Sequence, residues 1–230
     1  MAKTSHPNTQ SGNIIFFVLL AVVLMAALSF TIMRGDGGSH SIDREKLIIY
    51  STEVEQYGAE LSQAIQIILE SGKSESEVTF AHADAPAEYG DAGALPTDTQ
   101  IFSISGGQAE YRLPKSDIST ASNWEFYSQS NMPQVGSENA DLIAVLPNVT
   151  KDFCDVFNRR IGLDITTTYP DDPATCFKGF AADRYNGTYN ATPNTLDTST
   201  FSLMPTLRAC VICTDSGMPQ NHVYIVLYER

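Results

Sequence analysis

The sequence predicts an α+β protein: a long N-terminal transmembrane and amphipathic helix followed by an antiparallel β-sheet head. Three observations predict this fold class. An uncharged apolar run covers 14–33, a helical stripe of apolar residues lies within 41–72, and the chain beyond 73 contains short runs that alternate like strands. With 230 residues, the chain is long enough for this helix and one further domain with a core of its own.

The first segment is apolar enough to enter a bilayer. Residues 14–33 carry no charge, and thirteen of these twenty residues are Leu, Ile, Val or Phe. As a helix the segment is about 30 Å long, which matches one hydrocarbon core. Each of the thirteen favours insertion by about 0.3 to 0.6 kcal/mol. We therefore expect a transmembrane helix over 14–33, in contact with membrane lipid, in a single-pass protein.

Three fates of this apolar run are open. A signal peptide has an apolar region of only about 7 to 15 residues. Ala27 to Ser29 offers a small-x-small cleavage site, although the apolar run continues to Met33. A plain membrane anchor is the second fate. The third is a helix that leaves the membrane and assembles with other helices of its kind.

A short polar leader that ends in Gly12 and passes at once into the apolar run resembles the type IV pilin and type II secretion pseudopilin superfamily. In that superfamily a prepilin peptidase cuts after the glycine, and the exposed helix packs into a filament. The resemblance covers about residues 1–70. It implies a leader over 1–12 and a processing site at Gly12 and Asn13. It also implies other pilin-like subunits as partners through the N-terminal helix, and an inner-membrane location with the head in the periplasm or an extracellular filament.

Two residues depart from the superfamily's pattern. Its mature chains usually begin with Phe or Met, where this chain has Asn13, and carry Glu at the fifth mature position, where this chain has Phe17. Members of the superfamily that lack this Glu tend to be minor or tip subunits. The resemblance therefore implies a minor subunit rather than the major one.

A glycine-rich joint and a second helical segment follow the apolar run. Each of the three glycines in 34–40 disfavours a helix by up to about 1 kcal/mol, so we expect a flexible joint there. Beyond it, apolar residues at steps of three and four predict a helix that Ser41 caps and Gly72 ends. We expect its stripe to lie on the protein's own sheet, with a coiled-coil seam as the alternative. The stripe consists of Leu47, Tyr50, Val54, Tyr57, Leu61, Ala64 and Ile68.

The long helix is thus expected over 13–72 and a β-rich head with one short helix over 73–230. Gly106 and Gly107 indicate a hairpin turn. Thr150 and Gly162 delimit the short helix. The final strand is apolar on both faces, which indicates an inner strand, lying on the long helix. The expected strands are 77–80, 100–105, 108–113, 123–128, 141–146, 207–213 and 222–229.

The four cysteines are expected to form disulfides, which are the default on the oxidising side of a membrane. Cys210 and Cys213 have the C-x2-C spacing of zinc and redox sites, but no second such pair exists and the motif sits in an apparent strand. In a strand their Cα atoms lie about 10 Å apart, too far to be bonded to each other. We therefore expect Cys154 and Cys176 each to bridge to one of them, in either combination.

Charge and motifs exclude several classes of function. The net charge is −13, and every acidic residue lies beyond Arg34. We expect no nucleic-acid partner, because phosphate binding needs a basic surface. The sequence contains no catalytic or nucleotide-binding motif, so we expect no enzyme, no catalytic residue, no cofactor and no metal site. The acidic stretch 82–91 and the pair Asp171–Asp172 offer oxygen ligands for calcium but lack the spacing of an EF-hand.

The sequence therefore favours a pilin-like structural subunit, a minor one, of a type IV pilus or type II secretion pseudopilus. The alternative is a membrane-anchored or secreted periplasmic binding domain, for which the apolar run is only an anchor or a signal. The mature N-terminus discriminates, because Asn13 indicates pilin-type processing, Phe30 a signal peptidase and Met1 a plain anchor. Two long polar loops, 81–99 and 164–200, are expected either to contact partners or to move freely.

Overall fold

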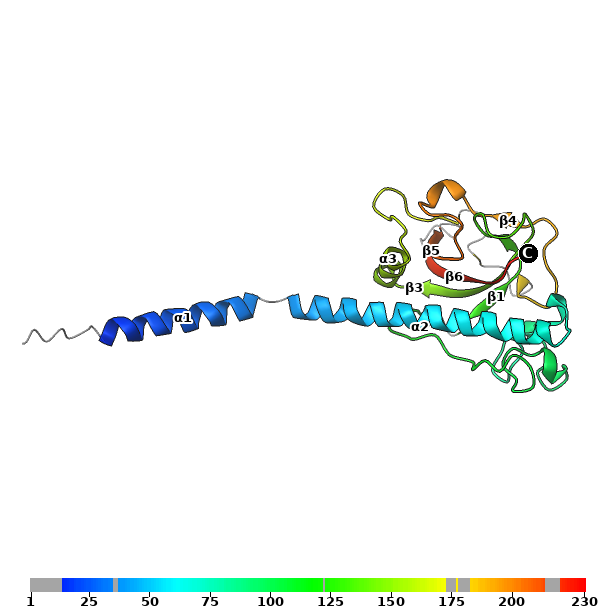
Figure 1. Cartoon of the computed structure of the whole chain (residues 1–230), viewed down its shortest axis with the longest axis horizontal. Coiled ribbons are helices and arrows are strands. Elements are labelled where there is room, and N and C mark those ends of the chain that lie inside the picture. Colours follow the sequence, from blue (N-terminus) through cyan, green and yellow to red (C-terminus); the bar gives the residue numbers. More distant parts are fainter. Residues whose placement is uncertain (1–13, 35–36, 122, 173–176, 178–182, 214–219) are drawn as a thin grey trace, which may run out of the picture. The chain divides into compact units, whose positions relative to one another are not determined.

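The computed structural model describes residues 14–34, 37–121, 123–172, 177, 183–213 and 220–230. The chain divides into two compact units, residues 1–45 and 46–230, which are described separately. The helices are α1 (Ile14–Arg34), α2 (Gly37–Glu70) and α3 (Lys151–Arg160) (Figure 1). The strands are β1 (Glu125–Tyr127), β2 (Ser130–Asn131), β3 (Leu142–Val149), β4 (Asn194–Thr195), β5 (Arg208–Cys213) and β6 (Gln220–Tyr228).

The first unit contains α1, and here the expected membrane span is corrected. Among the residues that the structure describes, no helix is both long enough and apolar enough to cross a bilayer. The predicted transmembrane helix over 14–33 is therefore wrong, and with it the transmembrane part of the predicted fold class.

Two further expectations depended on that span. The single-pass character and the inner-membrane localisation with an outward-facing head are wrong for the same reason, because the described residues provide no spanning helix. The leader over 1–12 and the processing site at Gly12 and Asn13 lie outside the described residues. The expected joint over 34–40 lies partly outside them, since 35–36 are not described, and α2 already begins at Gly37.

In the second unit, the apolar stripe of α2 is buried as the sequence predicts. Val54, Tyr57, Leu61, Ala64 and Ile68 are each at most 6% exposed and belong to one hydrophobic cluster. Leu47 and Tyr50 are partly buried and pack against the same cluster. The prediction that the stripe lies on the protein's own sheet rather than in a coiled-coil seam is confirmed, because residues of β1, β3, β5 and β6 belong to the same cluster.

The four-stranded sheet has the order β1-β3-β6-β5, and all its neighbours are antiparallel. The antiparallel sheet of the predicted fold class is confirmed, and β6 is an inner strand as expected. Alternate residues of β6 point to opposite faces, so Val223, Ile225 and Leu227 join the cluster with α2. Tyr224 joins a second cluster on the other face. The short strands β2 and β4 form a separate parallel pair.

The head is built in layers around α2 and the sheet. Figure 1 shows the strands on one side of α2, and the cyan-to-green segment that follows α2 on its other side. The second cluster fills the far face of the sheet, where Met132, Leu196 and Phe201 cover Ile143 and Tyr224. Both faces of the sheet are thus covered, which explains why its inner strands are apolar on both sides.

The short helix α3 forms at the predicted place. The hydroxyl of Thr150 accepts a hydrogen bond from the backbone N–H of Phe153, which caps the helix. Phe153 and Phe157 are fully buried, and Gly162, just beyond the helix, has a φ of +89°. The amphipathic spacing and the two end signals were enough to define this element.

Three of the expected strands are absent. Residues 77–80, 100–105 and 108–113 contain no named strand, and Thr79 forms only an isolated bridge with Gln100. The predicted hairpin at Gly106 and Gly107 is wrong. This segment instead closes on itself, since the backbone N–H of Gly107 donates to the carbonyl of Gln100 (3.0 Å). Its buried residues Ile101 and Ala109 belong to the cluster that contains the stripe of α2, and this packing buries them without a sheet.

Candidate interaction surfaces

The described part of α1 is apolar around its whole circumference. From Phe16 to Met25 the large side chains are exposed, with exposed fractions that run from 46% at Leu20 to 71% at Met25. Because successive residues of a helix point about 100° apart, exposure of consecutive residues means that every side of the helix is apolar. A helix of this kind is stable in water only when another surface covers it.

A disulfide joins α3 to β5. Cys154 is bonded to Cys210, with a distance of 5.3 Å between the two Cα atoms and 56 positions between them in sequence. This is one of the two pairings that the sequence left open for Cys154. Cys213 also takes part in a disulfide, and Cys176 lies outside the described residues. The C-x2-C motif lies in a strand, as expected from the sequence.

The outer edge of β5 is closed by the side chain of Asn158 and by the loop that contains Pro170 and Asp172. The Nδ2 group of Asn158 donates to the carbonyl of Cys210, and its Oδ1 accepts from the N–H of Cys210, both at 2.7 Å. Two positions further, Ile212 donates to the carbonyl of Pro170 (2.9 Å) and accepts from Asp172 (3.0 Å). The free backbone groups that an edge strand would offer to another strand are therefore used within the chain at these residues.

The opposite edge, at β1, is closed in the same manner. The N–H of Phe126 donates to the hydroxyl of Tyr89 (2.8 Å), and the carbonyl of Phe126 accepts from the N–H of Tyr185 (2.9 Å). A partner strand cannot pair with the sheet at either of these positions. Binding by strand addition is therefore disfavoured for this head, and contacts with partners must use side-chain surfaces.

A charged cluster supports the closed edge at β1. Arg184 forms two hydrogen bonds with Glu125, from Nε to Oε2 (2.7 Å) and from Nη2 to Oε1 (2.9 Å), and a third with Glu88 (2.9 Å). The hydroxyl of Tyr89 donates to Glu125 as well (3.0 Å). Burial, followed by the negative charge of Glu125, raises the pKa of Tyr89, so its hydroxyl keeps its proton and remains a donor.

A groove of about 390 Å³ lies between α2 and the segment 112–115. Its floor is apolar and includes Val54, Ile118 and Leu146, together with Tyr57 and Trp124, whose rings meet edge to face at 5.2 Å. Exposed Gln56 and Leu113 lie at its opening. The volume falls within the range that small ligands and protruding side chains occupy in proteins.

The walls of this groove carry fixed charges. The Nζ atom of Lys115 lies 4.4 Å from the centre of the Tyr50 ring and is paired with Glu53. The guanidinium of Arg112 lies 5.3 Å from the centre of the Tyr57 ring and is paired with Glu60 (2.6 Å). Cations that are held over aromatic rings by carboxylates are already ordered before any partner arrives.

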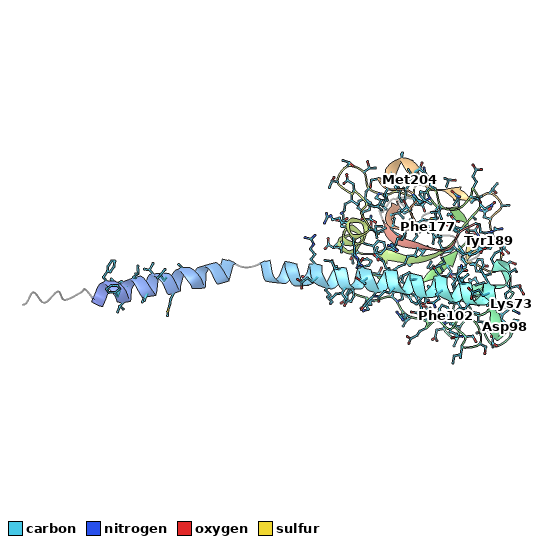
Figure 2. All side chains as sticks on the ribbon, in the orientation of Figure 1. Lys73, Asp98, Phe102, Phe177, Tyr189 and Met204 are labelled. Carbon is cyan, nitrogen blue, oxygen red and sulfur yellow. A yellow bond between two sulfur atoms is a disulfide. The ribbon has the colours of Figure 1, made fainter. Side chains whose placement is uncertain are left out.

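The loop 81–99 is anchored at the end of α2. Gln100 donates from Nε2 to the carbonyls of Ala92 (2.9 Å) and Leu95 (3.0 Å), and Lys73 pairs with Asp98 (2.8 Å), two residues that Figure 2 labels. Within the described residues, no group of three His, Cys, Asp or Glu side chains is placed to hold a metal ion. The acidic stretch 82–91 and the pair Asp171–Asp172 are among these described residues, so neither belongs to such a group.

Sequence reasoning missed several of these features. Asn158 follows Cys154 by four residues, so it stands on the buried face of α3, and this spacing of a polar residue was a usable signal. Nothing in the sequence indicated that Arg184 would meet Glu125, or that 112–115 would lie beside α2. Compared with protein-family models, curated proteins and solved structures, the chain matches none of them.

Proposed function

We propose that this chain is a pilin-like structural subunit, a minor one, that joins other subunits of its kind through its apolar N-terminal helix. The observation that carries the proposal is the exposed apolar surface of α1, which continues around the helix from Phe16 to Met25. Burying such a surface contributes about 25 cal/mol for each Å² removed from water. Similar helices of neighbouring subunits offer a surface of matching chemistry.

The head supports a structural role by its rigidity. Disulfide Cys154–Cys210 ties α3 to β5, and the edges of the sheet are closed at Phe126, Cys210 and Ile212. A head with closed edges does not polymerise through its strands. Contacts between the N-terminal helices therefore determine how the subunits are arranged in an assembly. This division of roles between an assembling helix and a self-contained head is what the resemblance to pilins implies.

The test replaces Leu20 and Leu24 of α1, both exposed, by aspartate in the full chain. Charges on a contact between apolar helices are strongly disfavoured, so we expect the variant to lose its assemblies. The matched control replaces the same two residues by methionine, which keeps their volume and apolar character. Light scattering coupled to size-exclusion chromatography measures the mass of the assemblies.

A photo-reactive amino acid at Val23 shows whether the assembly is specific. We expect cross-links to residues 16–27 of another copy or of another subunit of the same kind. Cross-links scattered over the head, or an aspartate variant that assembles like the unsubstituted chain, would overturn the proposal. The processing site at Gly12 and Asn13 stays a prediction, and mass spectrometry of the mature N-terminus tests it separately.

A further inference from the structure

Residues 112–117, which we call the strap, run along α2 and are connected to it by charged side chains. The strap and α2 are antiparallel, because the residue number rises along α2 as it falls along the strap. Three ion pairs connect them. These pairs are Lys46–Asp117, Glu53–Lys115 and Glu60–Arg112.

One face of α2 provides all of these attachments. The residues that contact the strap follow one another at steps of four and three, which places them on the same side of a helix. The hydroxyl of Tyr50 donates to Asp117 (3.1 Å), and the hydroxyl of Tyr57 accepts from the backbone N–H of Arg112 (3.3 Å). The full set on α2 is Lys46, Tyr50, Glu53, Tyr57 and Glu60.

Packing contributes little to the attachment of the strap. Every residue of the strap is exposed except Pro114, which is half-buried. The groove of about 390 Å³ lies between the strap and the apolar floor formed by Val54, Ile118 and Leu146. Atoms that face each other across an empty volume make no dispersion contacts. The polar contacts with α2 therefore hold the strap in place.

Both ends of the strap are anchored independently of these contacts. On one side, the hydroxyl of Tyr111 donates to Asn123 (3.0 Å), and the centres of the Tyr111 and His82 rings lie 3.7 Å apart. On the other side, Ile118 is buried, and its carbonyl accepts from the N–H of Thr150 (2.8 Å). A segment with fixed ends and few buried contacts opens locally, while the rest of the domain stays folded.

Salt reaches the three ion pairs. The exposed fractions of their side chains run from 29% at Glu60 to 51% at Lys46. Attraction between exposed charges weakens as the Debye length falls, from about 30 Å at 0.01 M salt to about 3 Å at 1 M. Each exposed pair stabilises a structure only slightly, so screening of all three changes the balance between the attached and the released strap.

From these observations we propose that the strap is a salt-sensitive cover of the groove, attached to α2 at low ionic strength and released at high ionic strength. Release removes one wall of the groove and uncovers its apolar floor, together with Tyr57 and Trp124. The head thus exposes an apolar surface to an extent that depends on the ionic strength around it. This device lies within the head and does not depend on α1.

The test uses Trp124, which is the single tryptophan of the chain and is only 4% exposed. Quenching of its fluorescence by acrylamide is measured on the full chain between about 0.01 M and about 1 M sodium chloride. We expect the ratio of released to attached strap to rise about tenfold, which three exposed ion pairs of ordinary strength account for, and quenching to rise with it. Salt that only strengthened apolar burial would lower the quenching.

Circular dichroism on the same samples distinguishes local release from unfolding. We expect the helical signal to stay constant while the quenching rises. Quenching that does not rise with salt overturns the proposal, and so does quenching that rises only as the helical signal is lost.

Variants of α2 identify the charges that are responsible. The double variant Glu53→Gln and Glu60→Gln removes two carboxylates and keeps the size of both side chains. We expect it to show raised quenching at low salt and a smaller response to added salt. The matched control Asp98→Asn breaks the exposed pair with Lys73, two residues that Figure 2 labels, and should keep the low-salt value and the full response. A double variant that behaves like the unsubstituted chain contradicts the proposal.

The same measurement on the chain with Leu20→Asp and Leu24→Asp separates the strap from assembly through α1. Loss of assembly with an unchanged response of Trp124 to salt supports both proposals. A chain that assembles as expected but whose Trp124 does not respond to salt contradicts the strap proposal alone.

Discussion

Ile225 of β6 lies directly against the backbone of α2 at Gly58. A Cβ atom at position 58 would stand 2.6 Å from Cδ1 and 2.8 Å from Cγ2 of Ile225. Glycine in the middle of a helix normally costs about 1 kcal/mol relative to alanine. At position 58 the absence of a side chain allows α2 to pack directly against Ile225 of the inner strand β6.

Replacing Gly58 by alanine should therefore destabilise the head, against the usual trend in helices. We expect the free energy of unfolding to fall by about 1 to 3 kcal/mol, the typical cost of forcing extra atoms into a packed core. Urea unfolding followed by circular dichroism measures the change. Adding Ile225→Val should recover part of the loss, because it removes Cδ1. A Gly58→Ala chain that is more stable than the unsubstituted one would contradict the prediction.

Asn158 should be one of the most sensitive polar residues of the head. Asn158→Ala leaves both the N–H and the carbonyl of Cys210 buried without their side-chain partner, and each such group costs about 1 to 3 kcal/mol. It also opens the edge of β5, so we expect more aggregation on heating. Thermal unfolding and light scattering measure both effects. Lys151→Ala on the exposed side of α3 is the control, and it should change neither.

Removing disulfide Cys154–Cys210 should lower stability by about 2 to 4 kcal/mol, because the bond closes a loop of 56 positions in the unfolded chain. The double variant Cys154→Ala and Cys210→Ala, compared in urea with the unsubstituted chain, measures this loss. Peptide mapping without reductant should show Cys154 linked to Cys210. A map in which Cys154 is linked to Cys213 instead would contradict the structure.

Arg184→Ala should destabilise the edge at β1, because it leaves Glu125 partly buried without its two charged hydrogen bonds. We expect a loss of about 2 to 4 kcal/mol, near the lower end of what breaking a buried ion pair costs, because both side chains keep some contact with water. Arg184→Lys should recover only part, since lysine does not donate in two parallel bonds. Lys73→Ala, which breaks the exposed pair with Asp98, should leave the unfolding midpoint almost unchanged.

Asp141 gives the head a characteristic dependence on pH. Burial raises the pKa of this carboxyl above 3.8, although the N–H groups of Met132 and Arg230 donate to it and partly offset the effect. The folded chain therefore holds this proton more tightly than the unfolded chain. The stability that comes from this group is present below pH 3.8 and is lost as the pH rises through the raised folded value.

Measurement of the Asp141 carboxyl by 13C NMR over a pH titration tests this directly. An apparent pKa at or below 3.8 would contradict the prediction. In unfolding experiments at a series of pH values, Asp141→Asn removes this titration. The free energy of unfolding of the variant, relative to that of the unsubstituted chain, should therefore increase as the pH rises from 3.8 through the raised pKa of Asp141. Asp117 has the opposite effect on stability. Its hydrogen bonds with Lys46 and then Tyr50 lower its pKa, so its stabilising contribution is present above pH 3.8 and is lost as the pH falls through the lowered folded value.

Local patterns in the sequence were enough for α3 and for the buried stripe of α2. Both elements combine a period of three to four residues with end signals, and both depend on residues close in sequence. The segment 100–113 shows the limit of that reasoning, since its alternation resembles strands although its buried residues Ile101 and Ala109 pack in the cluster with α2. Alternation reports only that some side chains are buried, and it does not report which surface buries them.

By itself the sequence determined α3, the antiparallel character of the four-stranded sheet, the buried face of α2, and a short set of possible cysteine pairs. Only the tertiary structure decided that Cys154 bonds to Cys210, that Asn158 and Tyr89 close the edges of the sheet, and that a groove forms beside 112–115. It also overturned the membrane span that the run 14–33 suggested. The physical reason is that periodicity and capping act over a few neighbouring residues, whereas these contacts join residues tens of positions apart, and such pairs form only when the whole chain has packed.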